Sequence, residues 1–229
     1  YGWFPGVLRV KLGVNELLAT IMLNSIAALI VEYLVQFPMR ADTSAVAHSP
    51  VIDEAAQLMS FLPGSKWGVG FVIAVLAVIV VYYYLWRTKS GYEQRMAGQS
   101  RKFALFGGIL SDRAAIRAML ISGALAGLAG AIEVMGVHRR IMTGFSVGLG
   151  FDGLTTAILG QVHPFGVFIV AILFSGLKLG AQIGLQLSLD IPRELGGTII
   201  GFIILFVAAG KMYEESIVRA REWFLGRGG

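Results

Sequence analysis

The sequence predicts an all-α, polytopic integral membrane helical bundle that contains a re-entrant or broken half-helix. Only 14% of its 229 residues are charged and 56% are hydrophobic, whereas a soluble domain has about 25% charged residues. Long apolar runs such as 68–86 do not alternate between polar and apolar residues, as the strands of a membrane β-barrel would. Because a helix satisfies its own backbone hydrogen bonds, these runs favour membrane-spanning helices.

The net charge of +5 and the absence of cysteine narrow the classes of function. Lys and Arg concentrated in cytoplasmic loops explain the positive charge, so we expect membrane lipid rather than nucleic acid as a partner. Without cysteine there is no thiol chemistry, and the three scattered histidines predict no metal site. No nucleotide-binding fingerprint or catalytic constellation occurs, so we expect neither a cofactor nor enzymatic activity in this chain.

The first half of the chain contains two predicted spans. Residues 1–13, which include a proline and three glycines, are expected to form a loop. Residues 14–36 are long enough to cross a bilayer, which takes roughly 20 residues. A polar loop over 37–67, with a short surface helix over 53–62, separates this span from the most apolar one, 68–86.

The third predicted span covers 118–137. It carries Gly123-x-x-x-Gly127, a spacing of small residues that lets membrane helices approach closely. The glycine-rich segment 138–150 follows as a loop.

The broken half-helix is predicted over 150–161 and ends before Pro164, because proline disfavours helix in the residue before it. A half-helix at membrane depth is tolerated only inside protein or along a cavity. Two further spans, 166–187 and 192–210, and a charged tail complete the predicted order.

The segment 87–117 is a patterned basic loop between two of the spans. Its basic residues are Arg87, Lys89, Arg95, Arg101, Lys102, Arg113 and Arg117, against the acids Glu93 and Asp112. Each Lys or Arg at the bilayer centre costs about 2.5–3.5 kcal/mol, so this segment must lie in water on the cytoplasmic side. The loops 37–67 and 138–150 are then outside, although Arg139 and Arg140 oppose that assignment.

Glu16, Thr20 and Asn24 recur every four residues and therefore share one stripe of the first span. Polar groups within a membrane usually face protein or water. The stripe is thus expected to line a solute path. The alternatives are that it forms hydrogen bonds between helices, or that Glu16 simply lies at the cytoplasmic end of the span.

Asp152, Thr155 and Thr156 lie near the start of the half-helix. The helix dipole and free N–H groups there suit the oxygens of a polar ligand, while Asp152 has the alternative of capping its own helix. Lys178, in the following span, is expected to have a structural role rather than to bind a ligand.

Several motifs together resemble the permease subunits of bacterial ABC importers for ribose-type sugars, nucleosides and branched-chain amino acids. The strongest is GYEQRMAGQSRKFALFGGI at 91–109, which is similar to their cytoplasmic loop. The segments at 13–24, 122–140, 150–160 and 163–166 are similar to the nucleoside and simple-sugar subgroup. The chain departs from the usual pattern at Ser100, Phe103 and His163.

This resemblance implies a multi-pass protein of the bacterial plasma membrane that moves nucleosides or simple sugars inward by alternating access. It implies three partners: a separate ABC ATPase, a second, paralogous permease, and an extracytoplasmic substrate-binding protein. Residues 1–229 would form a single permease domain, the C-terminal portion of a longer permease. The alternative is a stand-alone secondary transporter or channel for a small polar solute.

The same resemblance implies that segment 87–117 holds the helix that couples the permease to its ATPase. The residues that match this role are Glu93, Arg95, Gly98, Ala104 and Gly108.

Overall fold

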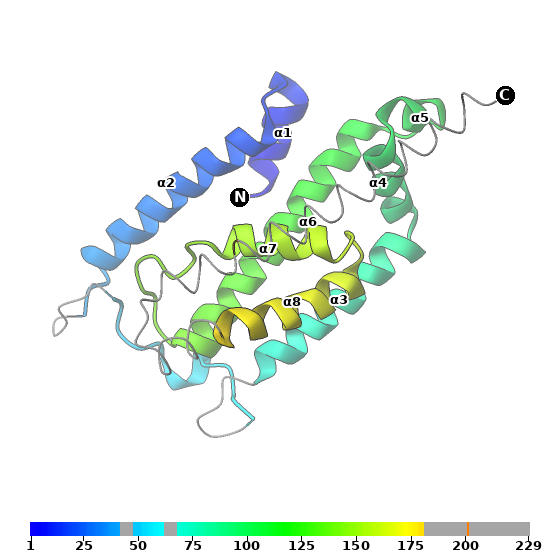
Figure 1. The fold of residues 1–229 in the computed structure, drawn as a ribbon. Helices are drawn as coiled ribbons and strands as arrows, with labels where there is room; N and C mark the ends of the chain where they lie inside the picture. The colour runs from blue at the N-terminus through cyan, green and yellow to red at the C-terminus, as the bar shows by residue number, and fades with distance from the viewer. Residues whose placement is uncertain (42–47, 62–67, 181–200, 202–229) are drawn as a thin grey trace. The chain divides into compact units, whose positions relative to one another are not determined.

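The computed structural model describes residues 1–41, 48–61, 68–180 and 201. These ranges are helices and turns, and their β-type contacts are two isolated bridges, His48 with Met142 and Ser60 with Gly68. The chain divides into two compact units, Tyr1–Val147 and Gly148–Gly229. Figure 1 shows the helices of both units, coloured along the chain. The predicted all-α class is confirmed.

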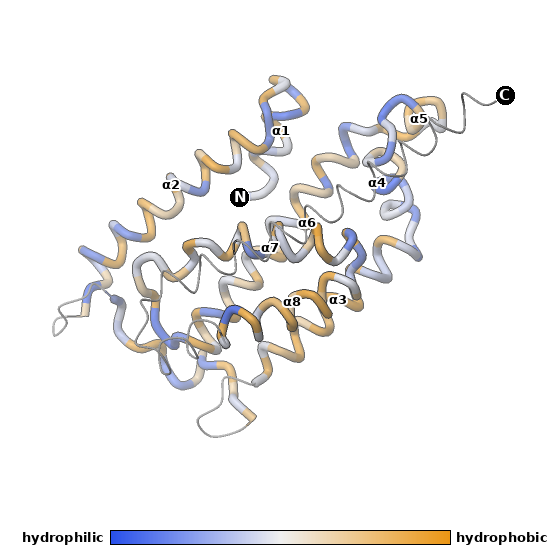
Figure 2. The backbone as a smooth tube through the Cα atoms, viewed as in Figure 1, coloured by the Kyte–Doolittle hydropathy of each residue, from blue (hydrophilic) through white to orange (hydrophobic). Residues whose placement is uncertain are grey.

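The first unit contains three helices that are long and apolar enough to cross a membrane: Glu16–Gln36, Val69–Arg87 and Ser111–His138. Its elements are α1 (Trp3–Leu12), α2 (Glu16–Gln36), a 3-10 turn (Glu54–Ala56), α3 (Val69–Arg87), α4 (Lys89–Gln99), α5 (Arg101–Phe106), α6 (Ser111–Ile132) and a π-helical extension (Glu133–His138). Figure 2 shows that α3 is largely hydrophobic whereas α4 is largely hydrophilic. The three predicted spans in this part of the chain are therefore present as helices.

Residues 1–13 are not the predicted loop, because they contain helix α1. Pro5 lies in the first turn of α1, where a backbone N–H has no helical partner to lose. Gly13 ends the helix in the left-handed conformation, with φ at 65° and its N–H bonded to the Arg9 carbonyl at 3.0 Å. Of the residues that indicated a loop, Gly13 therefore ends the helix, and Pro5 occupies a first-turn position where proline is permitted.

Two other boundaries differ from those predicted. The third span begins at Ser111 rather than 118, so that part of the basic loop is the start of a helix. In the described part of 53–62, the expected surface helix is reduced to the 3-10 turn Glu54–Ala56.

Helix α1 packs against α6 through glycines on both helices. A Cβ on Gly123 would lie 2.9 Å from the Gly2 Cα, and a Cβ on Gly6 would lie 3.3 Å from the Ile116 Cα. Close approach at Gly123 is thus as predicted from the small-residue spacing. A Cβ on Gly127 would meet nothing within 4 Å, so the described structure does not show close packing at that position.

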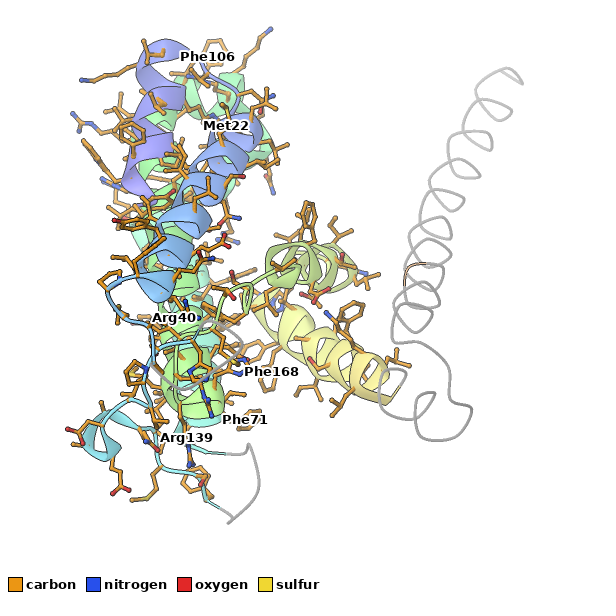
Figure 3. The ribbon with its side chains drawn as sticks, turned by 90° about the vertical axis from the view of Figure 1, so that its left-hand side faces the viewer. Met22, Arg40, Phe71, Phe106, Arg139 and Phe168 are labelled. Atoms are coloured by element: carbon orange, nitrogen blue, oxygen red, sulfur yellow. The ribbon has the colours of Figure 1, made fainter. Side chains whose placement is uncertain are left out.

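Described parts of the two loops predicted to be outside, 48–61 and 138–147, lie at the same end of the first unit. The N–H groups of Ile52 and Leu58 donate to the carbonyls of Arg139 and Met135 at 2.9 and 3.1 Å. Figure 3 shows Phe106, in the basic segment, at one end of this unit and Arg139 towards the other. This arrangement agrees with the predicted separation of the basic segment from the two loops.

The described part of the second unit contains two short apolar helices, α7 (Leu149–Leu159) and α8 (Pro164–Leu179). Helix α7 matches the predicted half-length helix, and Pro164 begins α8 at the first helical position, where proline is favoured. The predicted span 166–187 is described only to 180. The span 192–210, except for residue 201, and the charged tail lie outside the described residues.

The turn between α7 and α8 contains a strained valine. Val162 has a φ of 56°, a left-handed conformation that costs a residue with a Cβ about 1–2 kcal/mol. We expect Val162→Gly to stabilise the full-length protein by about 0.5–1 kcal/mol, after the extra chain entropy of glycine is subtracted. Thermal unfolding in detergent measures this, and Val162→Ala, which keeps the Cβ, should show little of the gain.

Candidate coupling segment and polar sites

Helix α4 is joined to the membrane helix α3 by a tight corner at Thr88 and Gly91. The Thr88 hydroxyl donates to the Tyr84 carbonyl at 2.6 Å and accepts from the Gly91 N–H at 3.1 Å, which caps α4. Gly91 is buried, and a Cβ there would lie 2.1 Å from the Tyr84 carbonyl oxygen. The corner therefore fixes the direction in which α4 leaves the span.

Two of the predicted coupling residues tie α4 to its neighbours. Glu93 forms an ion pair with Arg117 of α6 at 3.1 Å, and Arg117 also reaches the Ser90 hydroxyl at 3.4 Å. The Arg95 guanidinium carbon lies 5.0 Å from the centre of the Trp86 ring, within the range of a cation–π interaction. Both side chains thus hold α4 in place against the two flanking spans.

Ala104 and Gly108 shape α5. Ser100 caps this helix by accepting the Phe103 N–H at 3.3 Å, and Ala104 is only 1% exposed. Gly108 has a φ of 73°, and the Ile109 N–H donates to the Ala104 carbonyl at 2.9 Å. This bonding pattern is a Schellman ending, in which glycine takes the left-handed position. The packing and the helix ending within this chain therefore explain why alanine stands at position 104 and glycine at position 108.

Gly98 differs, because nothing in the described chain requires a glycine there. A Cβ on Gly98 would meet nothing within 4 Å. The residue lines a cavity of about 210 Å³ between α1, α4 and α6, together with Arg101 and Ser111. The Ser111 hydroxyl is buried and has no hydrogen-bond partner among the described residues.

Helix α5 presents large apolar side chains to the surroundings. Phe106 is 93% exposed (Figure 3). Phe103 and Leu105 are also exposed. Exposed apolar clusters on a polar segment are typical of surfaces that bind another protein or a membrane. Phe103, one of the departures from the family pattern, belongs to this surface.

The polar stripe of α2 begins at a cluster of charges. Glu16 forms an ion pair with Arg9 of α1 at 2.7 Å, and the Thr20 hydroxyl donates to the Glu16 carbonyl at 2.8 Å. Asn24 is exposed. Asn15, which the sequence analysis did not single out, caps the helix by accepting the Leu17 N–H at 2.9 Å. The i, i+4 spacing correctly put the three polar residues on one stripe of α2. The spacing did not indicate that Glu16 forms an ion pair with Arg9 at the start of the helix.

On α7 the three predicted residues have different surroundings. Asp152 forms an ion pair with Lys178 of α8. The hydroxyls of Thr155 and Thr156 donate to the carbonyls of Phe151 and Gly153 at 2.8 and 2.9 Å, and Thr156 is buried. All three belong to the second unit, whereas the α2 stripe belongs to the first.

Asp152 does not cap its own helix, which corrects one of the two alternatives drawn from the sequence. The N-cap position of α7 is Gly148, with a φ of 85° and no capping side chain. Lys178, expected to be structural, is the residue that Asp152 contacts. The sequence did contain a signal for this pair. Asp152 and Lys178 are single opposite charges on consecutive apolar helices, and such charges need a partner.

Comparison with known proteins identifies the family. Residues 1–208 match the profile described as the branched-chain amino acid transport system / permease component. The chain therefore belongs to this permease family, and it is an integral membrane protein. No solved structure matches it.

Among curated relatives, the chain is 32% identical to a guanosine ABC transporter permease protein of Bacillus subtilis, over 91% of this chain and 61% of the relative. It is 28% identical to a nucleoside ABC transporter permease protein of Lactococcus lactis, over 96% of this chain and 62% of the relative. It is 26% identical to a glucose ABC transporter permease protein of Haloferax volcanii, over 92% of this chain and 58% of the relative. The chain thus spans about three fifths of the length of these relatives.

Proposed function

We propose that the chain belongs to the permease subunit of an ATP-driven importer in a bacterial plasma membrane, which carries nucleosides or simple sugars inward. The observation that carries this proposal is the family match over 1–208, together with relatives named for guanosine, nucleoside and glucose transport. Hydrolysis of ATP would occur on a separate ABC ATPase. A second permease and an extracytoplasmic binding protein would complete the assembly.

The mechanism proposed is alternating access driven through α4 and α5. Movement of the ATPase would push on the exposed residues of this segment, including Gly98 and Phe106. The Glu93–Arg117 ion pair and the Arg95–Trp86 contact would pass the movement to α6 and α3. Glu16, Thr20 and Asn24 on α2 and Asp152, Thr155 and Thr156 on α7 would offer polar groups to the solute.

Gly98 provides the sharpest test of the coupling role. We expect Gly98→Trp to lower ATP-dependent uptake at least tenfold while leaving folding intact, because Gly98 is exposed and a Cβ there meets nothing within 4 Å, so the indole would extend from an open position. Uptake is measured in proteoliposomes that contain the full-length permease with its ATPase and partner permease, supplied with the binding protein. Thermal unfolding of the purified complex checks that the variant is folded.

Gly98→Ala is the matched control and should keep nearly full uptake, because a single methyl group meets nothing within 4 Å. Uptake that is unchanged in Gly98→Trp would contradict the coupling role. Solute flux that needs an ion gradient but neither ATP nor partners would instead support the secondary transporter.

A further inference from the structure

The ion pair between Asp152 and Lys178 joins the open ends of the helical hairpin formed by α7 and α8. Asp152 lies in the first turn of α7 and Lys178 in the last turn of α8. The α7–α8 turn, around Gly160 and Gly166, is at the other end of the hairpin. The pair therefore places one carboxylate and one ammonium side by side between two apolar helices.

Asp152 also lies at the helix end that favours its charge. A carboxylate is stabilised near the positive N-terminal end of a helix, and Asp152 lies in the first turn of α7. The two opposite charges cancel, so this part of the hairpin carries no net charge. A charge-neutral pair is the arrangement that apolar membrane helices tolerate best.

The pair retains the capacity to bind a ligand. The side chains of Lys178 and Asp152 are 33% and 30% exposed, so neither is enclosed by the chain. An ammonium has three N–H donors, and a carboxylate has about four acceptor positions. The single contact between Lys178 and Asp152 leaves most of these donors and acceptors free. The remaining donors and acceptors suit hydroxyl and amide groups, which both donate and accept.

We propose that Asp152 and Lys178 form a specificity element that admits uncharged polyhydroxylated solutes and disfavours their phosphorylated forms. The carboxylate of Asp152 neutralises the ammonium group of Lys178. Without that partner, the ammonium would attract the phosphate group of a solute. The inference rests on the proposed function, since it requires the pair to face the solute path. It assigns Lys178 a role in selection that the sequence did not indicate.

The test compares ligand pairs that differ only by a phosphate: uridine with uridine 5′-monophosphate, and ribose with ribose 5-phosphate. Binding is measured on the complete purified complex without the binding protein, which would otherwise impose its own selectivity. The unaltered complex should favour the neutral member of each pair. In Asp152→Asn, the unpaired Lys178 should shift the ratio of affinities towards the phosphorylated member at least tenfold.

The double variant Asp152→Asn with Lys178→Gln removes both charges and should lose that shift. If Asp152→Asn does not fold, Lys178→Gln alone is measured, and its unpaired carboxylate should shift the ratio at least tenfold against the phosphorylated ligands. An unchanged ratio in the folded single variant would overturn the proposal.

Failure of the proposed function gives a different result. Absence of ATP-dependent uptake of uridine and ribose by the unaltered complex with its binding protein would count against the transport function. Normal uptake with an unchanged affinity ratio in the variant would reject only the role assigned to the ion pair.

Discussion

Gly91→Ala is expected to disrupt the corner between the membrane helix α3 and helix α4, the proposed coupling helix. The added Cβ would lie 2.1 Å from the Tyr84 carbonyl oxygen and 2.6 Å from the Leu85 Cα, both of which are backbone atoms that no rotamer change can move. We expect a loss of stability at or above the upper end of the about 1–3 kcal/mol typical of overpacking. Uptake should fall at least tenfold, because α4 would leave the span in another direction.

The measurement is thermal unfolding of the full-length permease in detergent, together with ATP-dependent uptake. Gly98→Ala, on the same helix, is the control, since its Cβ meets nothing within 4 Å. Replacing a helical glycine with alanine there should stabilise α4 by up to about 1 kcal/mol. Equal effects of the two substitutions would show that close packing at Gly91 does not determine the geometry of the corner.

Gly160→Val is expected to open the hairpin of α7 and α8. A Cβ on Gly160 would lie 2.4 Å from the Val167 nitrogen and 2.6 Å from its Cα, and a Cβ on Gly166 would lie 2.4 Å from the Gly160 carbonyl oxygen. The two helices therefore meet backbone to backbone at these glycines. The expected cost is again at least about 1–3 kcal/mol, and separation of the helices should break the Asp152–Lys178 pair and abolish uptake.

The loss of stability expected for Gly160→Val can be separated from the effect of helix propensity. Its φ is −77°, which any residue adopts, so a loss of stability would come from lost space rather than from backbone strain. Gly153→Ala, on the exposed face of the same helix, is the control and should be neutral or stabilising. Normal stability of Gly160→Val would show that the hairpin is not held together at this crossing.

The existence of the first three spans and the position of the basic segment between two of them followed from the sequence alone. Apolar runs about 20 residues long can satisfy their backbone groups in a membrane only as helices, so α2, α3 and most of α6 were predictable. The end of α7 before Pro164 followed from the loss of a backbone donor. These features depend on residues close together in the chain, and for that reason local composition determines them.

Helix α1 and the start of α6 were not predictable in this way. The glycines of 1–13 read as a loop, because their role in packing against Gly123 depends on a helix more than 100 residues away in the chain. The basic charges of the 111–117 region suggested a loop, yet Arg117 pairs with Glu93, and Asp112 with Arg101, across the helices. A charge that finds its partner in another helix gives no sign of that in its own segment.

Some features of the candidate site were likewise predictable from the sequence, and others only from the folded structure. Spacing in the sequence indicated the stripe of α2 and the polar start of α7, and the family resemblance indicated the coupling residues. Only the tertiary structure showed which of these residues form ion pairs: Glu16 with Arg9, Glu93 with Arg117 and Asp152 with Lys178. It also showed that Gly98 is open while Gly91 is enclosed. Pairing and enclosure depend on distances through space, and only the folded chain sets those distances.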